Sequence, residues 1–229
     1  MAAGAVSGSR PTPEGFRSCT GVPSLDEAPE FTAGVLDALR QPLESGRLTI
    51  TRVGGTAVYP ACFQLVLAAN YCPCAQPEGC ACPPDVRRRY LARLSGPLLD
   101  RVDMHVEVPR ITRAELLADG GVGEASSVVA ARVAQAREAA ALRYAGTPWS
   151  TNGQVPAVEL RRRWPVSAAA RREAEDALER GMLTARGFGR VLRLAWTLAD
   201  LQGAGEPGPE HVGHALGFRT GRTRSSVAA

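Results

Sequence analysis

A predominantly apolar run, CFQLVLAA at residues 62–69, constrains the fold of this chain more than any other feature of its sequence. Pro60 precedes the run and a cysteine-rich loop follows it, so its length suits a strand rather than a helix. A strand with apolar residues on both faces is typical of a parallel sheet that helices cover on both sides. The sequence therefore predicts an α/β fold with a buried parallel strand at this position.

The flanking segments extend this prediction. Residues 31–44 show helical spacing of apolar side chains, with a disturbance at Pro42. Alternation from Arg47 to Val58, interrupted by a Gly-Gly pair, indicates a β-hairpin inserted ahead of the buried strand. We expect one helix at residues 84–101 and a second alternating strand at 102–109. Together these segments predict a parallel sheet that carries an inserted hairpin.

The rest of the sequence indicates helices alone. Helical spacing recurs in residues 126–145, 167–181, 184–203 and 206–219, and a Pro/Gly-rich loop is expected at 144–158. We therefore expect four parts: a disordered lead-in at residues 1–20, an α/β module at 21–110, an all-helical domain at 111–220 and a disordered tail at 221–229.

Charge and hydropathy narrow the surroundings and partners of the chain. The formal net charge is +4, which fits a nucleic-acid or nucleotide partner and also fits an ordinary globular protein. No apolar run approaches the roughly 18 residues of a membrane span, and the N-terminus lacks the apolar segment of a signal peptide. We expect a cytoplasmic protein with reduced thiols and no membrane partner.

Polar residues follow a short run before residue 26 and the buried strand at 62–69. Two adjacent carboxylates, Asp26 and Glu27, can divide their work: one helps to hold Mg²⁺ through water, and the other polarises an attacking water. Acidic residues at a solvated helix N-terminus are the alternative. Asn70 follows the buried strand, where an amide can orient a water or a phosphate oxygen, or can cap the loop.

Two arginines are further candidates. Arg101 lies between a predicted helix and a strand, from where a guanidinium can neutralise phosphate charge on a neighbouring subunit, or can pair locally with Asp100 or Asp103. Arg186 lies at the N-terminal end of an apolar helix. There it is able to point at a ligand, although most such arginines only solvate a surface.

Four cysteines, Cys72, Cys74, Cys80 and Cys82, form two C-x-C pairs that are five residues apart. Four thiolates on one loop suit a closed tetrahedral zinc site with a structural role. The usual zinc knuckle is C-x-x-C, and C-x-C is a tighter bite. Zinc and four reduced cysteines in a loop therefore both remain open.

Taken in order, five segments resemble the magnesium-chelatase-like AAA+ ATPases of the YifB/ComM family: LDEAPEF, VLDALRQPLESGRLTITR, YPACFQLVLAANYCPC, RRRYLARLSGPLLDRVDMHVEVPR and LTARGFGRVLRLAWTLADLQG. The likeness covers residues 21 to about 219. It implies part of an AAA+ three-layer core followed by an all-α helical lid domain. It also implies ATP and Mg²⁺ as cofactors, a hexameric homo-oligomeric ring, and a helicase-like motor that remodels DNA.

The resemblance also assigns roles to residues. Asp26 and Glu27 match the Walker B motif, with Glu27 activating the hydrolytic water. Asn70 matches sensor 1, Arg101 the arginine finger and Arg186 the sensor 2 arginine. The hairpin is similar to one that lines the central channel of related rings, where it can grip a nucleic-acid strand.

One requirement of the family is missing from these residues. A phosphate-binding P-loop needs G-x-x-x-x-G-K-[ST], and the 229 residues contain no lysine. We therefore expect the C-terminal part of such an ATPase, truncated before the P-loop and inactive alone. The alternative is a non-catalytic module that binds DNA or acts with a full-length paralogue.

Overall fold

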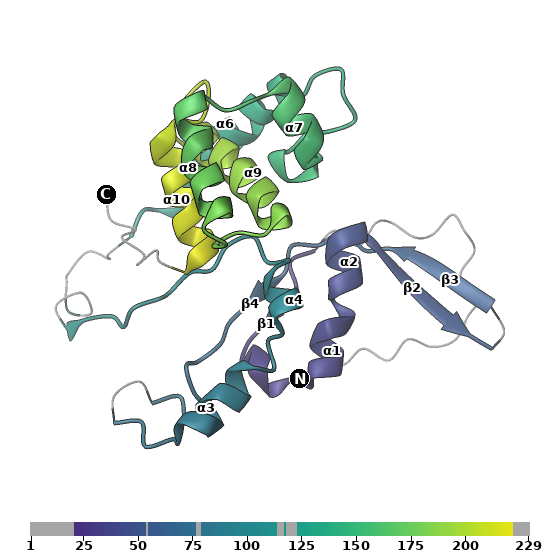
Figure 1. The fold of residues 1–229 in the computed structure, drawn as a ribbon, viewed down its shortest axis with the longest axis vertical. Helices are drawn as coiled ribbons and strands as arrows, with labels where there is room; N and C mark the ends of the chain where they lie inside the picture. The colour runs from purple at the N-terminus through teal and green to yellow at the C-terminus, as the bar shows by residue number, and fades with distance from the viewer. Residues whose placement is uncertain (1–20, 54, 77–78, 114–116, 118–122, 222–229) are drawn as a thin grey trace. The chain divides into compact units, whose positions relative to one another are not determined.

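The structure is a computed structural model and describes residues 21–53, 55–76, 79–113, 117 and 123–221 (Figure 1). Residues 1–20 and 222–229, where disordered ends were predicted, lie outside these described residues. The chain divides into two compact units, residues 1–102 and 103–229, and each is described by itself. As predicted, the fold is mixed α/β with a small parallel sheet, whereas a three-layer core remains a prediction.

The parallel sheet of the first unit joins two short strands, β1 (Ser24–Leu25) and β4 (Val66–Leu67). Backbone hydrogen bonds extend this pairing on both sides, from Gln64 N to Gly21 O at 3.0 Å and from Ala28 N to Ala68 O at 2.8 Å. Pro23 has no N–H to donate, but its carbonyl accepts from Val66 N at 3.0 Å. The pairing therefore tolerates the proline.

The expectation of a long strand buried on both faces at residues 62–69 is wrong. Only Val66 and Leu67 have strand geometry, and the Val66 side chain is 41% exposed. Within the described residues, β4 pairs with β1 alone, so no second strand adjoins it. Apolar composition predicted the strand and its parallel pairing, but it overstated the strand's length and burial.

The hairpin is confirmed. Before it, the predicted helix at 31–44 is broken into α1 (Ala33–Ala38) and α2 (Arg40–Ser45). Gly46 then adopts a left-handed conformation with φ of 64°, which ends α2 and begins the hairpin. Strands β2 (Arg47–Arg52) and β3 (Gly55–Pro60) pair antiparallel, with Arg47 opposite Pro60 and Arg52 opposite Gly55. In Figure 1 the hairpin extends away from the end of α2.

The predicted helix at 84–101 also forms as two pieces, α3 (Pro84–Leu91) and α4 (Gly96–Leu99). Ser95 begins α4 because its Oγ accepts a hydrogen bond from Leu98 N at 3.3 Å. The same hydroxyl donates to Asp37 Oδ1 at 2.6 Å, which ties α4 to α1. A 3₁₀ turn, η1 (Ala28–Glu30), contacts α3.

The second unit is helical, with α9 (Ala185–Leu201) in contact with the other main helices. The predicted helices form as α6 (Ser126–Arg143), α8 (Ala168–Glu179) and α10 (Pro209–Thr220). Two further elements, η2 (Asn152–Gln154) and α7 (Ala157–Arg163), were not predicted. No helix among the described residues is long and apolar enough to span a membrane.

The second predicted strand, at residues 102–109, is wrong. Only Glu107 makes a bridge there. His105 N instead donates to Phe218 O at 2.7 Å, so this segment is held to the end of α10. Alternation of side chains in a segment this short does not supply a neighbouring strand to pair with. Here the backbone forms a hydrogen bond with the last turns of α10 instead.

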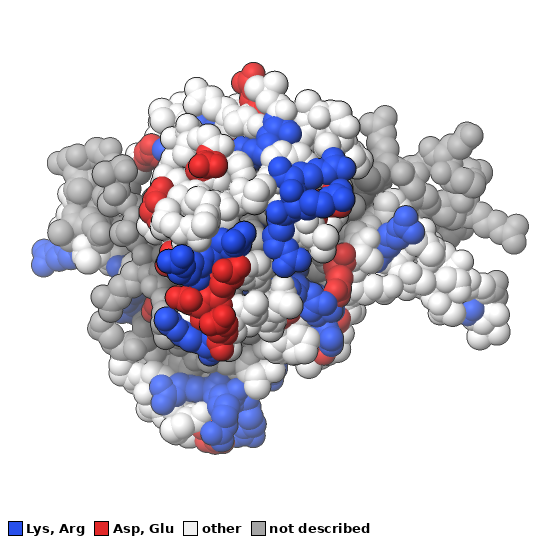
Figure 2. Space-filling model, turned by 45° about the horizontal axis from the view of Figure 1, so that its top comes forward, with Lys and Arg blue, Asp and Glu red and all other residues white. Residues whose placement is uncertain are grey.

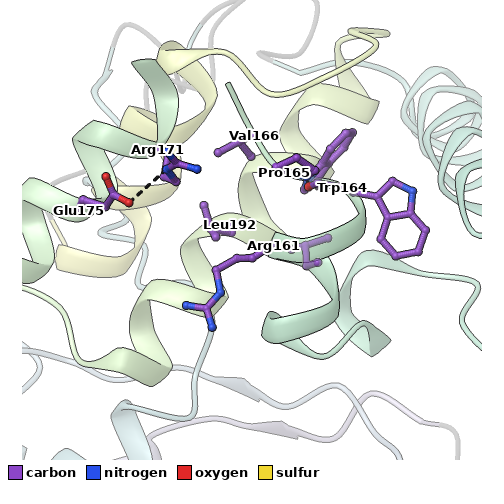
Figure 3. Close-up of a pocket in the computed structure, with 9 residues that line it drawn as sticks. Arg161, Trp164, Pro165, Val166, Arg171, Glu175 and Leu192 are labelled. Carbon is purple, nitrogen blue, oxygen red and sulfur yellow. Dashed lines mark hydrogen bonds and ion pairs between the residues drawn. The ribbon is translucent and has the colours of Figure 1, made fainter. Parts of the chain in front are cut away.

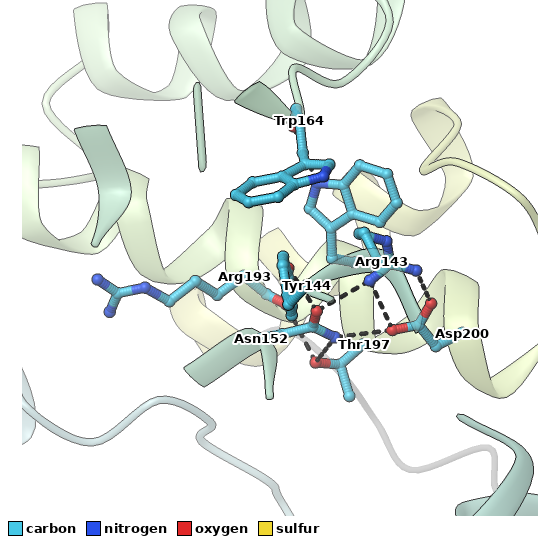
Figure 4. A network of polar contacts seen from close by, with 8 residues as sticks. Arg143, Tyr144, Asn152, Trp164, Arg193, Thr197 and Asp200 are labelled. Carbon is cyan, nitrogen blue, oxygen red and sulfur yellow. Dashed lines mark hydrogen bonds and ion pairs between the residues drawn. The ribbon is translucent and has the colours of Figure 1, made fainter. Parts of the chain in front are cut away.

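A buried polar network joins α6, η2 and α9 (Figure 4). Arg143 forms an ion pair with Asp200 and donates to Asn152 Oδ1 at 3.0 Å. Asn152 Nδ2 donates to Asp200 Oδ2 at 2.8 Å, and the Tyr144 hydroxyl donates to Asn152 Oδ1 at 2.8 Å. The Arg143 guanidinium also lies 4.1 Å from the centre of the Trp196 ring. Charge and hydrogen-bonding groups are thus matched within this network.

Candidate functional site

Three predicted site residues lie together at one edge of the parallel sheet. Asp26 and Glu27 directly follow β1, and Asn70 lies three residues beyond the end of β4. The strands are parallel and in register, Leu25 opposite Leu67, so their carboxyl ends meet at the same edge. All three side chains are exposed there. This arrangement places two carboxylates and an amide where a ligand can reach them.

Glu27 has an unusual backbone conformation, with φ of 49° and ψ of 43°. A left-handed conformation costs a residue with a Cβ about 1–2 kcal/mol. The turn is supported on both sides: Glu27 N donates to Asp26 Oδ1 at 2.9 Å, and Glu27 O accepts from Glu30 N at 2.7 Å. Such strained residues persist where the surroundings hold them, and they are frequent at functional sites.

Tyr90 of α3 belongs to the same site, although nothing in the sequence marked it. Its side chain is only 5% exposed. Burial, together with the negative charges of Glu30 and Glu27, raises the pKa of Tyr90, while a hydrogen bond with the Asn70 backbone opposes this. Tyr90 therefore contacts the segment that carries Asn70 and feels the charges of the carboxylate turn.

Arg101 is held within its own unit. Its Nε donates to Glu44 Oε2 at 3.0 Å, its Nη2 also contacts that oxygen, and its Nη1 donates to Pro97 O at 2.8 Å. The side chain is 12% exposed. The local partner considered from the sequence was Asp100 or Asp103, but the ion pair that forms is with Glu44. Glu44 lies 57 residues away, so sequence spacing gave no signal for it.

Arg186 is an exposed residue in the first turn of α9, in the helical unit. The same unit contains a pocket of about 210 Å³ between α7, α8 and α9 (Figure 3). Two aromatic side chains, Trp164 and Trp196, contribute to its wall, and Arg171 pairs with Glu175 there at 3.2 Å. None of the residues predicted as sites from the sequence lines this pocket.

The four clustered cysteines converge. Their Sγ atoms all lie within 4.8 Å of one another, so the cluster could hold a metal ion. The Cys72–Cys74, Cys72–Cys80 and Cys74–Cys80 Sγ separations are 2.9, 3.3 and 3.5 Å. Around a metal with bonds of about 2.3 Å, tetrahedral sulfurs lie about 3.8 Å apart. These three separations fall short of that value by less than an ångström, so small shifts would produce it.

The thiols of the cluster differ in pKa. Hydrogen bonds from Cys74 and Cys80 lower the pKa of Cys72 to about 7. The contact with Cys72 in turn raises the pKa of Cys74 to about 12. Each cysteine in the described part of the chain is a free thiol. A cluster that readily loses one proton, with three more sulfurs in reach, has the donor set that soft divalent metals prefer.

Surface charge is mixed on the face shown in Figure 2, where most basic patches have an acidic patch beside them. Ion pairs within single helices bring opposite charges together, including Arg89–Asp85 in α3 and Arg163–Glu159 in α7.

Comparisons with known proteins identify the family of the chain. The family model of the magnesium chelatase subunit ChlI matches residues 3–116, and that of the ChlI C-terminal region matches residues 123–219. An uncharacterized protein of Mycobacterium tuberculosis is 49% identical over 211 residues, which make up 91% of this chain and 42% of that protein.

The relatives also include ComM and YifB proteins. Competence protein ComM of Haemophilus influenzae is 40% identical over 87% of this chain and 39% of its own length. YifB of Salmonella typhimurium is 35% identical over the same shares. The chain thus spans about two fifths of the length of these relatives. With both family models matched in order, the chain belongs to the magnesium-chelatase-like family that includes ComM and YifB.

Proposed function

We propose that this chain supplies the Walker B, sensor and arginine-finger residues of a YifB/ComM-type AAA+ ATPase, a ring-shaped motor that remodels DNA. Asp26 would hold Mg²⁺ through water and Glu27 would activate the hydrolytic water. Asn70 would orient that water or the γ-phosphate, and Arg186 would sense the nucleotide from the helical lid. The name of one relative, competence protein, fits a role in handling DNA.

The observation that carries this proposal is the shared edge of β1 and β4. In open parallel sheets, ligands bind beyond the carboxyl ends of the strands. Here that edge brings the carboxylate pair and Asn70 to one place, and the left-handed turn at Glu27 sets the direction of its side chain. A Walker B glutamate and a sensor amide must both reach the same attacking water, which is the geometry that adjacent parallel strands give.

The P-loop has to come from residues outside these 229 or from another chain, because these residues contain no lysine. We therefore expect the purified 229-residue chain to show no ATP turnover above background. Turnover that Glu27→Gln abolishes would overturn this. Asp85→Asn is a matched control, since Asp85 is an exposed acidic residue on α3 that pairs with Arg89.

Arg101 is proposed to act on nucleotide bound by a neighbouring chain. It would have to exchange its pair with Glu44 for phosphate oxygens, and this pair would keep the guanidinium ordered until then. Adding the chain to an intact ATPase of the family should change its rate of ATP hydrolysis. Arg101→Ala should remove the change, whereas Arg87→Ala, at an exposed arginine on α3, should not. Equal effects of the two variants would refute the role.

A second candidate, DNA binding by a non-catalytic module, rests on the hairpin. Arg47 begins β2 and Arg52 ends it, and Leu48 and Ile50 between them are 37% and 39% exposed. A hairpin that leaves apolar residues uncovered on an extended ribbon suits a bound strand or partner. Binding to DNA should weaken as salt rises, and each of Arg47→Ala and Arg52→Ala should reduce the salt slope by about 1 if its arginine contacts one phosphate. The control is Arg87→Ala, and identical affinity in all three variants and the wild-type chain would exclude this use of the hairpin.

We also propose zinc as the metal of the cysteine cluster, in a structural role. Four thiolates leave no open coordination position, and sulfur ligands select zinc among the common divalent ions. Protein purified without added zinc should contain about one zinc per chain. A ratio near zero in folded material would exclude zinc.

A further inference from the structure

We propose that the four-cysteine metal site is a positioning device for Asn70: the bound metal fixes the segment 68–72 against α3 and so places the sensor amide. This inference rests on the proposed zinc occupancy, and it adds a function for the metal. The cluster then helps to fix the edge of the sheet, and the loop after Asn70 does more than connect β4 to α3.

Asn70 lies midway between two fixed points. On one side, Ala68 is held to the β1 side of the sheet, since its N donates to Leu25 O at 2.9 Å and its O accepts from Ala28 N at 2.8 Å. On the other side, Cys72 is 3% exposed and is the most buried of the four cysteines. With anchors two residues away in each direction, the backbone at Asn70 has little freedom while both anchors hold.

The proposed metal site would join two segments that both follow Asn70 in the chain. Cys72 and Cys74 follow Asn70, while Cys80 and Cys82 come directly before α3, which begins at Pro84. α3 carries Tyr90, whose hydroxyl meets the Asn70 backbone. A metal bound by all four sulfurs would therefore connect the sensor segment to the helix that packs against it.

The turn between Cys72 and Cys80 includes a strained residue. Ala75 adopts a left-handed φ of 53° without being glycine, and a turn bond from Ala75 N to Cys72 O at 3.1 Å supports it. Contacts between thiols are weak hydrogen bonds. The side-chain amide of Asn70 is exposed, so its placement depends on the backbone. Loss of the metal should release the anchor at Cys72 and with it the position of the amide.

The sequence offers a direct test, because it contains only two asparagines, Asn70 and Asn152. Protein labelled with ¹⁵N at asparagine alone gives one set of amide signals from the sheet edge and one from the helical unit. On removal of zinc by a chelator, the backbone and side-chain signals of Asn70 should shift or broaden, and they should return when zinc is added. The Asn152 signals should stay in place, since Asn152 is held by the Arg143–Asp200 network.

Two variants make the test specific. Cys80→Ser should reproduce the zinc-free Asn70 signals. Cys62→Ser, at an exposed thiol outside the cluster, should retain the zinc-bound signals. Protein that is folded but contains no zinc as purified would exclude the metal proposal and this inference together. If zinc is bound in a 1:1 ratio but the Asn70 signals do not change when it is removed, the zinc proposal stands and this inference is overturned.

Discussion

Replacing Asp200 by alanine tests how strongly the buried network stabilises the helical unit. The Asp200 side chain is 1% exposed and its partner Arg143 is 12% exposed. Asp200 accepts from Arg143 Nη1 at 3.1 Å, from Arg143 Nη2, and from Asn152 Nδ2 at 2.8 Å. Removing the carboxylate deletes all three bonds and leaves a guanidinium charge with little access to water.

The expected loss follows from what Arg143 keeps. Breaking a buried ion pair by removing one partner costs about 3–5 kcal/mol. Arg143 retains its bond to Asn152 Oδ1 at 3.0 Å and its position 4.1 Å from the Trp196 ring centre, and a cation over an indole is worth about 1–2 kcal/mol. We therefore expect the free energy of unfolding to fall by about 3 kcal/mol, at the lower end of that range.

Tryptophan fluorescence reads this unit selectively, because all three tryptophans, at positions 149, 164 and 196, lie in residues 103–229. Urea titrations of the wild-type chain and Asp200→Ala give the difference directly. Asp176→Ala is the matched control: Asp176 is half exposed and lies 3.7 Å from Arg180, so the change should stay below about 1 kcal/mol. A loss for Asp200→Ala no larger than that of the control would refute the reasoning.

Three further changes in the helical unit are read by the same titration, and an unchanged free energy of unfolding would contradict each. Tyr144→Phe removes the hydroxyl that donates to Asn152 Oδ1 at 2.8 Å and should cost about 1 kcal/mol at pH 7. Burial raises the pKa of Tyr144 above its ordinary 10.0, so its stabilising contribution is present below pH 10 and is lost as the pH rises through the folded-state value. The wild-type chain should therefore lose stability more steeply above pH 10 than Tyr144→Phe does. Gly189→Ala brings a Cβ within 2.6 Å of the Ala157 Cβ and should cost about 1–3 kcal/mol, and adding Ala157→Gly should restore most of that loss. Ser167→Ala removes the cap that accepts from Ala170 N at 3.3 Å and should cost about 0.5–2 kcal/mol.

Local patterns predicted the elements whose stability is local. The apolar spacing of 184–203 predicted α9, the spacing of 167–181 predicted α8, and the Gly-Gly pair predicted the hairpin. The pairing of β1 with β4 confirms the parallel sheet near Asp26 and Asn70, while the roles of those residues stay predictions. Spacing of 3.6 or 2 residues is visible in sequence because each element buries its own face.

Features that depend on distant residues could not be predicted. The length of β4 depends on which strands adjoin it, and apolar composition does not contain that information. The short helix α7 ends in three arginines and lacks an apolar stripe, so its sequence gave no helical signal. Glu44 meets Arg101, and Tyr90 meets the Asn70 segment, only through the tertiary fold. Contacts of this kind carry no periodic signature.

The two units differ in how much core they have, which predicts an order of unfolding. In the helical unit, one cluster around Val191, Leu192 and Trp196 joins residues from α6 through α10. Among the described residues of the first unit, the large buried hydrophobic side chains are Leu36, Tyr90 and Leu98. A module with so small a core needs a metal or a partner surface to hold it together.

The sheet unit should therefore unfold first. In urea, the folded-state signals of ¹⁵N-labelled Asn70 should be lost at a lower concentration than the tryptophan fluorescence transition, and zinc removal should move the Asn70 transition alone. The Asn152 signals should follow the tryptophans, because Asn152 is bonded to Asp200 inside the helical core. Coincident transitions for both asparagines, with and without zinc, would mean that the chain unfolds as one cooperative body. The sheet edge would then draw its stability from the whole chain rather than from the metal.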